Sequence, residues 1–467
     1  METLARAANR GSISTGYDID NSLKFEADNT EYLTRDPASS GDRQKFTTSM
    51  WVKRTELGQE STIFGVMPAS GQSDTNTFQF GFMSDDKFQL GLQTYYVFNT
   101  NRLFRDTSAW YHIVMAVDTT QATASNRLKL YINGIQETSF AVETYPNQNH
   151  STGVNFTEPH RIGTLIANSW YFSGYISEVN HIDGSQLAPT SFGEFDEDSG
   201  IWKPKAYAGS YGTNGFYLDF KDSANLGNDA SGGLDFTLNN ITSADQATDT
   251  PTNNFAVLNT ISATSTVLDA TEGATFLSNN DGSISWQTIS ATIGVTSGKW
   301  YWENQKNSNT GNFFSGIAAS DDPALRTANL LGATSEGSSI AFQYSNNSIA
   351  NGSGSFTMVS GEIMMFALDM DNGALYFGKQ GTWQNSSDPT SGASKTGAST
   401  LWSSFDDKIV LPALQAFQNN QIFTNFGGYS SYAISSAASD ENGYGTFEYA
   451  PPTGYYALCT KNLAEFG

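Results

Sequence analysis

Residues 46–53 read FTTSMWVK, and this alternation places the even-numbered side chains on one face of a β-strand. Comparable short stretches follow at 78–82, 87–92, 110–117 and 128–132. The last of these precedes Asn133-Gly134, a dipeptide typical of a tight hairpin turn because both positions tolerate positive φ. No helical period separates these stretches, so they predict an antiparallel β-sandwich.

The second half of the chain repeats this pattern. Strand-like stretches occur at 284–293, 299–305, 313–318, 339–344, 363–369, 375–377 and 422–426. Asp371-Asn372-Gly373 predicts a hairpin between two of them, and Asp322-Pro323 predicts one short helix. The predicted fold class is therefore all-β, with two antiparallel jelly-roll-type β-sandwiches joined by an ordered connector.

The chain is predicted to divide into four segments. Residues 1–21 are polar and cannot bury a face of their own, so we expect an arm that is either disordered or ordered by docking on a partner. The first sandwich is predicted over 22–191 and the second over 261–467. Residues 192–260 are rich in glycine turns but keep their aromatic side chains, which indicates an ordered connector, with one strand predicted over 216–220.

Composition excludes several classes of function. The formal net charge is -23, from 24 basic and 47 acidic residues. Phosphate backbones and anionic membrane surfaces would be repelled, so we expect no nucleic-acid partner. No stretch approaches the roughly 20 apolar residues of a membrane helix, so no membrane insertion is expected. With Cys459 alone, no intrachain disulfide can form, and no secretory signal is visible, which favours folding in a reducing cytoplasm.

Three places in the first half resemble the laminin G-like branch of the concanavalin A-like sandwiches. They are residues 46–53, residues 110–114 followed by 130–134, and residues 162–163 followed by 172–179. From about residue 265 the chain resembles a SPRY domain. The matching pieces are GKWYWE at 298–303, then 316–317, 371–378, 411–413 and 425–427 in the same order.

The pairing of these two domains is similar to structural proteins of tailed phages, especially marine ones. The arm at 10–14, the connector at 250–256 and the ending at 452–463 share this resemblance. It implies a virion protein that is assembled in the host cytoplasm. It also implies contacts with other virion proteins through the N-terminal arm, host surface glycans as a second partner, and a homo-oligomer.

Enzyme motifs are incomplete or absent in this sequence, so we expect no enzyme activity. Glucanases need two carboxylates in one cleft, and Glu194, Asp196 and Asp198 only partly fit that pattern, in a turn-rich segment. The four histidines are scattered, and His112 within a strand indicates a packed residue. No zinc-binding, phosphate-binding or nucleophile-elbow motif occurs.

Two kinds of ligand site are predicted. Laminin G-like domains often hold calcium through loop oxygens, so Asp85 and Asp86 at a strand tip are candidate ligands for Ca²⁺; no other cofactor is expected. Aromatic residues in loops can stack on sugar faces. The candidates for such a site are Tyr95, Tyr96, Trp170, Tyr171 and Trp383, although the two tryptophans could instead cover the core.

These observations predict a non-enzymatic phage virion protein. It would be a fibre, an appendage or a capsid decoration, with lectin-like sandwiches that attach to host glycans or to other virion proteins. A purely architectural capsid or tail component without receptor binding is the first alternative. A carbohydrate-active, glucanase-like enzyme is the second.

Overall fold

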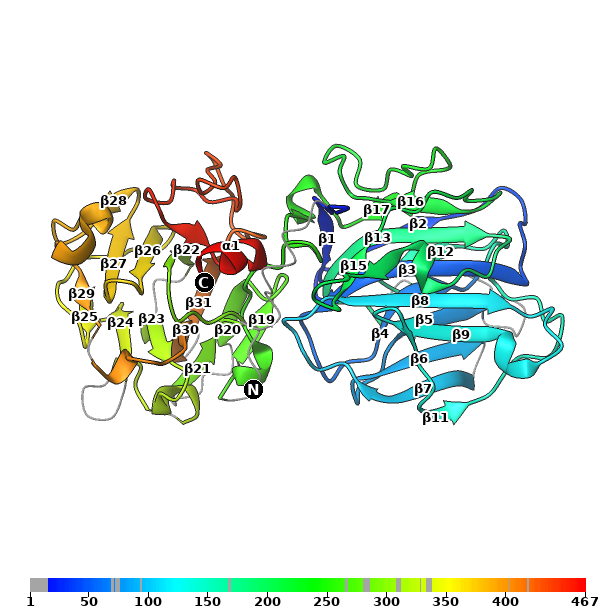
Figure 1. The fold of residues 1–467 in the computed structure, drawn as a ribbon, viewed down its shortest axis with the longest axis horizontal. Coiled ribbons are helices and arrows are strands. Elements are labelled where there is room, and N and C mark those ends of the chain that lie inside the picture. Colours follow the sequence, from blue (N-terminus) through cyan, green and yellow to red (C-terminus); the bar gives the residue numbers. More distant parts are fainter. Residues whose placement is uncertain are drawn as a thin grey trace. The chain divides into compact units, whose positions relative to one another are not determined.

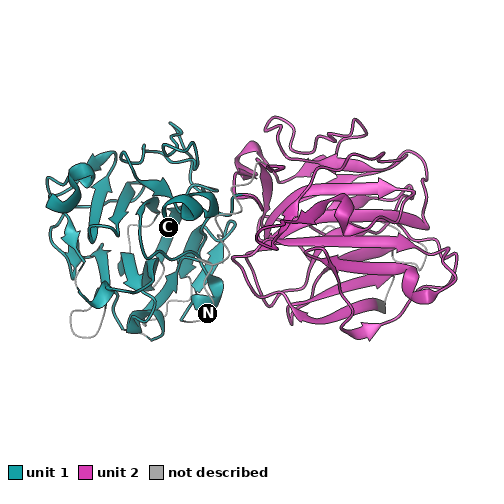
Figure 2. Ribbon diagram, in the orientation of Figure 1, with its two compact units in different colours: residues 1–13, 253–467 teal, residues 14–252 magenta. Residues whose placement is uncertain are grey.

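A computed structural model describes most of the chain. It covers residues 16–467 except 69–70, 72–75, 93–94, 167–168, 265–267, 280–285, 308–311, 328, 333–337, 402 and 418–419, and it omits the side chains of Tyr95 and Tyr96. The chain forms two compact units, one of residues 14–252 and one that contains residues 253–467 (Figure 2). Antiparallel strands dominate both units, which confirms the predicted all-β class (Figure 1).

The unit of residues 14–252 contains two eight-stranded sheets. Sheet A has the order β10 (Ile135–Gln136), β9 (Leu128–Ile132), β8 (Tyr111–Asp118), β3 (Lys45–Arg54), β13 (Gly174–Asp183), β1 (Ser22–Phe25) and β18 (Gln246–Ala247), with β16 (Phe216–Leu218) also on β13. Sheet B has the order β11 (Phe140–Glu143), β7 (Tyr95–Leu103), β6 (Lys87–Leu92), β5 (Phe78–Phe82), β4 (Ser61–Val66), β12 (His160–Ile162), β2 (Tyr32–Arg35) and β17 (Thr237–Asn239).

The core of this unit lies between sheets A and B. Alternate residues of the strands contribute to one apolar cluster, among them Phe46, Met50, Phe80, Phe88 and Leu90, each at most 1% exposed. Burial of each such side chain is worth about 1.5–3 kcal/mol. The predicted hairpin after β9 is confirmed, because Asn133 and Gly134 adopt φ values of 48° and 80°.

The segment predicted as a connector is divided between the units, because residues 192–252 belong to the first unit and residues from 253 onward to the second. Strands β16, β17 and β18 pair with sheets A and B. The hairpin of β14 (Gly193–Phe195) and β15 (Trp202–Pro204) packs on β8 of sheet A. Most of the predicted connector is therefore part of the first sandwich.

His112 on β8 shows how this hairpin is held. The indole Nε1 of Trp202 donates a hydrogen bond to His112 Nδ1 at 2.9 Å, so His112 Nε2 carries the proton and donates to Ser49 Oγ at 2.8 Å. The imidazole lies between the rings of Trp51 and Trp202, with centroids 4.7 and 5.8 Å away. Burial lowers the pKa of His112 to about 3, so the residue is a neutral packing histidine, as the sequence indicated.

The unit that contains residues 253–467 is built from two further sheets. Sheet C has the order β19 (Leu268–Thr271), β20 (Phe276–Asn279), β31 (Asn420–Asn425), β22 (Lys299–Lys306), β26 (Ile363–Asp369), β27 (Ala374–Lys379) and β28 (Thr382–Trp383), with β29 (Ser399–Thr400) on β27 and β32 (Tyr456–Ala457) on β22. Sheet D has the order β21 (Gln287–Ser290), β30 (Val410–Phe417), β23 (Asn312–Ala319), β24 (Ser339–Gln343) and β25 (Ser348–Ala350).

The KWYWE stretch lies on β22, and Glu303 within it organises the C-terminal segment. Its buried carboxylate accepts hydrogen bonds from the hydroxyls of Tyr301 and Tyr432 at 2.8 and 2.7 Å. It also accepts from the backbone N–H groups of Glu448 and Tyr449 at 3.0 and 2.8 Å. Burial raises the pKa of Glu303 above its ordinary value, while these four donors oppose that effect.

Helices are short. The α-helix α1 covers Thr460–Phe466. The 3-10 helices are η3 (Ala124–Asn126), η4 (Pro189–Ser191), η5 (Ser243–Asp245), η6 (Thr260–Ser262), η7 (Pro323–Leu325), η8 (Pro389–Ser394) and η9 (Ser403–Phe405). The predicted helix at Asp322-Pro323 is η7, and the Asp322 side chain caps it by accepting from Ala324 N at 2.8 Å. Within the described ranges no helix has the length and apolarity needed to cross a bilayer.

Candidate binding site at the edge of the first sandwich

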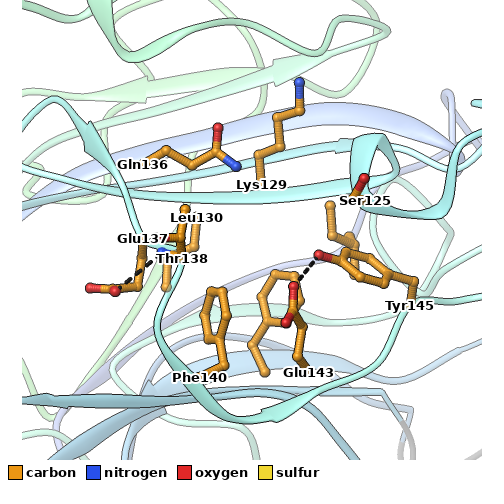
Figure 3. Close-up of a pocket in the computed structure, with 11 residues that line it drawn as sticks. Ser125, Lys129, Leu130, Gln136, Glu137, Thr138, Phe140, Glu143 and Tyr145 are labelled. Atoms are coloured by element: carbon orange, nitrogen blue, oxygen red, sulfur yellow. Dashed lines mark hydrogen bonds between the residues drawn. The ribbon is translucent and has the colours of Figure 1, made fainter.

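A pocket of about 180 Å³ opens at one edge of the first sandwich, between the last strands of the two sheets (Figure 3). Sheet A contributes β9 and β10, and sheet B contributes β7 and β11. The chain passes directly from β10 to β11, so the stretch 136–145 contributes lining residues on both sides of this opening. We call it the edge pocket. Its lining residues are Phe98, Ser125, Leu128, Lys129, Leu130, Gln136, Glu137, Thr138, Phe140, Glu143 and Tyr145.

Aromatic rings form one wall of the edge pocket. The rings of Phe98 and Phe140 stack with centroids 4.6 Å apart, and Tyr145 meets Phe98 edge-on at 5.5 Å. The register between β11 and β7 shifts between Phe140 and Val142, and a shift of this kind re-aims the side chains next to it. Phe140 and Tyr145 remain only half-buried, so part of each ring faces the opening.

A tyrosine and a carboxylate provide the polar groups beside this wall. Tyr145 Oη donates to Glu143 Oε1 at 2.6 Å, and the two side chains meet at the mouth of the pocket (Figure 3). Burial and this hydrogen bond raise the pKa of Tyr145 to about 12, so its hydroxyl stays protonated at neutral pH. Glu143 is exposed, and its second oxygen forms no hydrogen bond with the described residues, so it can accept one from a ligand.

Glu137 is a second carboxylate at this pocket, but its oxygens are already engaged. Oε2 accepts from Arg102 Nε at 2.7 Å. Oε1 accepts from the backbone N–H groups of Thr138 and Ser139 at 3.2 and 3.0 Å. The residue is 8% exposed, and these bonds fix the path of the chain from β10 to β11. Its role is to position the chain at the pocket.

The predicted aromatic residues lie on several different elements. Tyr95 and Tyr96 begin β7, but their side chains lie outside the described residues. Trp170 is half-buried with φ 59°, and its carbonyl accepts from Thr62 N at 2.9 Å. Tyr171, also half-buried, lies 6.1 Å from the ring of Tyr32.

Trp383 belongs to the other unit. It lies on β28, half-buried against Gly378 and edge-on to Tyr301, with ring centroids 6.5 Å apart. These contacts place much of the indole over the core, as in the alternative to sugar binding given above for Trp383.

Asp85 and Asp86 contact basic side chains. Asp86 is buried and forms ion pairs with Arg54 and Arg105 at 3.3 and 2.9 Å, and it also accepts from Gly58 N at 2.9 Å. Asp85 is exposed and pairs with Lys87 at 2.7 Å. Among the residues that the structure describes, no group of three or more histidine, cysteine or acidic side chains has the arrangement of a metal site. Calcium binding remains a prediction.

The acidic stretch at 194–198 lies on the β14–β15 hairpin. Glu194 is exposed and lies 3.7 and 3.8 Å from the ammonium groups of Lys203 and Lys205. Asp196 accepts hydrogen bonds from the backbone N–H and the hydroxyl of Ser199, both at 2.9 Å. These two bonds, together with the one from Lys203, lower the pKa of Asp196 to about 2. This stretch is therefore a turn held by salt bridges and hydrogen bonds.

The residues of the edge pocket were not identified from the sequence. Phe140, Glu143 and Tyr145 lie in a strand of four residues and the turn after it, and no strand was predicted there. The alternation of Phe140 and Val142 with smaller or polar neighbours was an available signal. The pocket itself depends on the meeting of two sheet edges, which no local pattern reveals.

The two eight-stranded sheets form an antiparallel β-sandwich with the edge pocket between their last strands. Residues 26–185 match the family described as the concanavalin A-like lectin/glucanases superfamily, in its laminin G-like branch. The match covers the central part of the predicted first sandwich and confirms the laminin G-like resemblance there. No curated protein sequence matches the chain significantly.

Solved structures similar to part of this chain include a SPRY domain, a pentraxin and one domain of an arabinanase. The SPRY domain of human HERC1 is 17% identical, with 36% of this chain and 96% of that one covered and a TM-score of 0.26. The SAP-like pentraxin of Limulus polyphemus is 18% identical, with 37% and 80% covered and a TM-score of 0.27. Domain 4 of the Geobacillus stearothermophilus arabinanase AbnA, solved with arabinotriose, is 22% identical, with 33% and 66% covered and a TM-score of 0.25.

Proposed function

We propose that the chain is a non-enzymatic structural protein of a phage virion, a fibre, appendage or capsid decoration that attaches to host surface glycans or to other virion proteins. The observation that carries the glycan-binding part is the edge pocket, where the half-exposed rings of Phe140 and Tyr145 lie beside the Glu143 carboxylate. The virion part is supported by the resemblance of the arm, the connector and the C-terminal ending to phage proteins.

The edge pocket has the chemistry of a sugar site. Its volume of about 180 Å³ has room for a single sugar ring. An aromatic face stacks on the C–H face of a sugar, while Glu143 and Ser125 can form hydrogen bonds with hydroxyls at its rim. The ligand class that we propose is therefore a terminal or protruding sugar of a surface glycan.

The bonds of Glu137 support a binding role over a hydrolytic one. Glycoside hydrolysis needs two carboxylates that act as acid and as base or nucleophile. Glu137 already accepts three hydrogen bonds from Arg102, Thr138 and Ser139, which leaves Glu143 as the one carboxylate at this pocket with an oxygen open to a ligand. Release of reducing ends from any retained glycan would instead support the enzyme alternative.

The glycan proposal is tested with Tyr145→Ala. Wild-type protein is screened on a glycan array, and calorimetry then measures the affinity for each retained glycan. Loss of the ring and of its bond to Glu143 should weaken binding about tenfold. Lys205→Ala is the control, because this exposed side chain is not among the residues that line the pocket and its loss should leave affinity unchanged. No retained glycan at high protein concentration would favour the architectural alternative.

The virion proposal is tested on purified particles. Mass spectrometry should detect the chain, and antibody labelling should place it on the capsid surface or on an appendage. Removal of residues 1–20 should abolish incorporation if the arm is the anchor. Absence of the chain from particles would contradict this proposal and leave the glycan test unaffected.

A further inference from the structure

The β14–β15 hairpin carries apolar side chains that the rest of the chain does not cover. Phe195 is 47% exposed and Ile201 36% exposed. Phe195 meets the ring of the buried Trp202 edge-on, with centroids 4.9 Å apart. Gly134 lies so close to the same ring that a β-carbon there would be 2.3 Å from it, and the next residue, Ile135, is 61% exposed. Phe195 thus contacts the anchoring tryptophan, while Ile201 precedes it in the chain and Ile135 follows the glycine that lies against it.

Acidic side chains lie beside these residues on the same hairpin. Glu197 and Asp198 are exposed in the turn between β14 and β15. Within the described part of the chain neither forms an ion pair, unlike Glu194, which lies near Lys203 and Lys205. We call Ile135, Phe195, Ile201, Glu197 and Asp198 the hairpin patch. An apolar surface with free carboxylates at its rim suits a partner that is both apolar and basic.

We infer that the hairpin patch binds the N-terminal segment, residues 1–15, of a second copy of this chain. That segment contains Arg6 and Arg10 against a single acidic residue, Glu2, and it also contains Leu4 and Ile13. It therefore offers the guanidinium and apolar groups that complement the patch.

Overall charge makes a local contact of this kind necessary for self-association. Each copy has a net charge of -23, so two copies repel each other unless basic groups lie in the interface. The chain has only 24 basic residues, and two of them, Arg6 and Arg10, lie close together near its N-terminus. A contact between this end and free carboxylates of another copy places opposite charges where the copies meet.

The first described residues of the chain are held on the first unit. Tyr17 Oη donates to Glu178 Oε2 at 2.9 Å, and Ile19 N donates to Thr252 Oγ1 at 3.0 Å. From Tyr17, fifteen residues can extend at most roughly 50 Å. This length is sufficient to contact a neighbouring molecule.

A charge-exchange experiment on the full chain tests the inference. Sedimentation velocity at low salt compares wild type with R6E/R10E and with E197K/D198K. Wild type should associate as its concentration rises, and each variant alone should associate about tenfold more weakly because arm and patch then carry the same sign. An equimolar mixture of the two variants should regain association, since each arm then meets a patch of opposite charge. Thermal unfolding of each variant verifies that the exposed changes leave the fold intact.

Two further observations complete the test. Phe195→Ser should weaken wild-type association without a change in the charges, because it removes apolar contact area. The inference is overturned if wild type stays monomeric at every concentration. Binding of the N-terminal segment to the hairpin patch of its own copy would also give this result. The inference is equally overturned if the variant mixture fails to associate or if all variants associate like wild type.

Discussion

Glu178 is the residue whose environment most clearly makes the stability of the fold depend on pH. It lies on β13 at a register shift relative to β3, with φ 52°, and is 6% exposed. Its carboxylate accepts from the hydroxyls of Tyr17 and Tyr217 at 2.9 and 2.7 Å. Burial raises the pKa of Glu178 to about 7, although the tyrosine bonds oppose this shift. The protonated form is therefore favoured in the folded chain relative to the unfolded one.

Replacement of Glu178 by glutamine should flatten part of the pH dependence of stability. With a folded pKa above the unfolded one, the contribution of Glu178 is fully present below about pH 4.5 and is lost as pH rises through about 7. The loss is about 3 kcal/mol. Urea unfolding of wild type and E178Q across this range measures the difference. Glu197→Gln, at an exposed position, serves as control, and an unchanged slope in E178Q would contradict the assignment.

Residue types alone predicted some of these side-chain environments. A histidine between Tyr111 and Ile113 was expected to be packed, and His112 is buried against two tryptophans. The burial of Glu178 could not be predicted, because its partners Tyr17 and Tyr217 are 161 and 39 positions away in the chain. Contacts of that range follow from topology, which a single sequence does not specify.

At the scale of elements, the β14–β15 hairpin is attached to sheet A mainly through Trp202. Trp202→Ala removes a large, 8% exposed side chain together with its bond to His112, which should cost about 3–5 kcal/mol if the site does not collapse. Limited proteolysis should then cut within 193–204. The His112 pKa, followed by NMR, should rise from about 3 toward its ordinary value as water reaches the ring. Ile201→Ala, at a 36% exposed neighbour, should change neither measurement.

Long strands could be predicted from alternation, and short ones could not. The eight to ten residues of β3, β8 and β22 supply several periods each, and all three lie where the sequence placed them. The strand predicted over 216–220 is confirmed as β16, but β17 and β18 have three and two residues, which is too short for a periodic signal. Because these two strands were not predicted, residues 192–260 were interpreted as a connector. The β10–β11 edge that forms the pocket was missed for the same reason.

At the scale of the whole molecule, the first unit depends on its last sixty residues for charge balance. Lys53 is fully buried and pairs with Asp249 at 2.7 Å, and the buried Arg35 pairs with Asp229 at 3.3 Å. Lys24, also buried, lies 2.9 Å from Glu31 and 2.8 Å from Asp245. All three cations belong to the segment 22–191, while Asp229, Asp245 and Asp249 lie beyond it. Desolvation opposes the charge on Lys53 and Arg35, and it lowers the pKa of both.

A chain cut at residue 191 should therefore fail to fold, although that is the boundary predicted from the sequence. Loss of one partner from a buried ion pair costs about 3–5 kcal/mol. Two such losses, at Arg35 and Lys53, consume most of the 5–15 kcal/mol that holds an ordinary domain together. Residues 14–252 retain every one of these partners and should unfold cooperatively in urea when expressed alone. Circular dichroism and urea titration of the 14–191 and 14–252 fragments compare the two. Equal stability of the shorter fragment would show that the buried cations do not require these carboxylates.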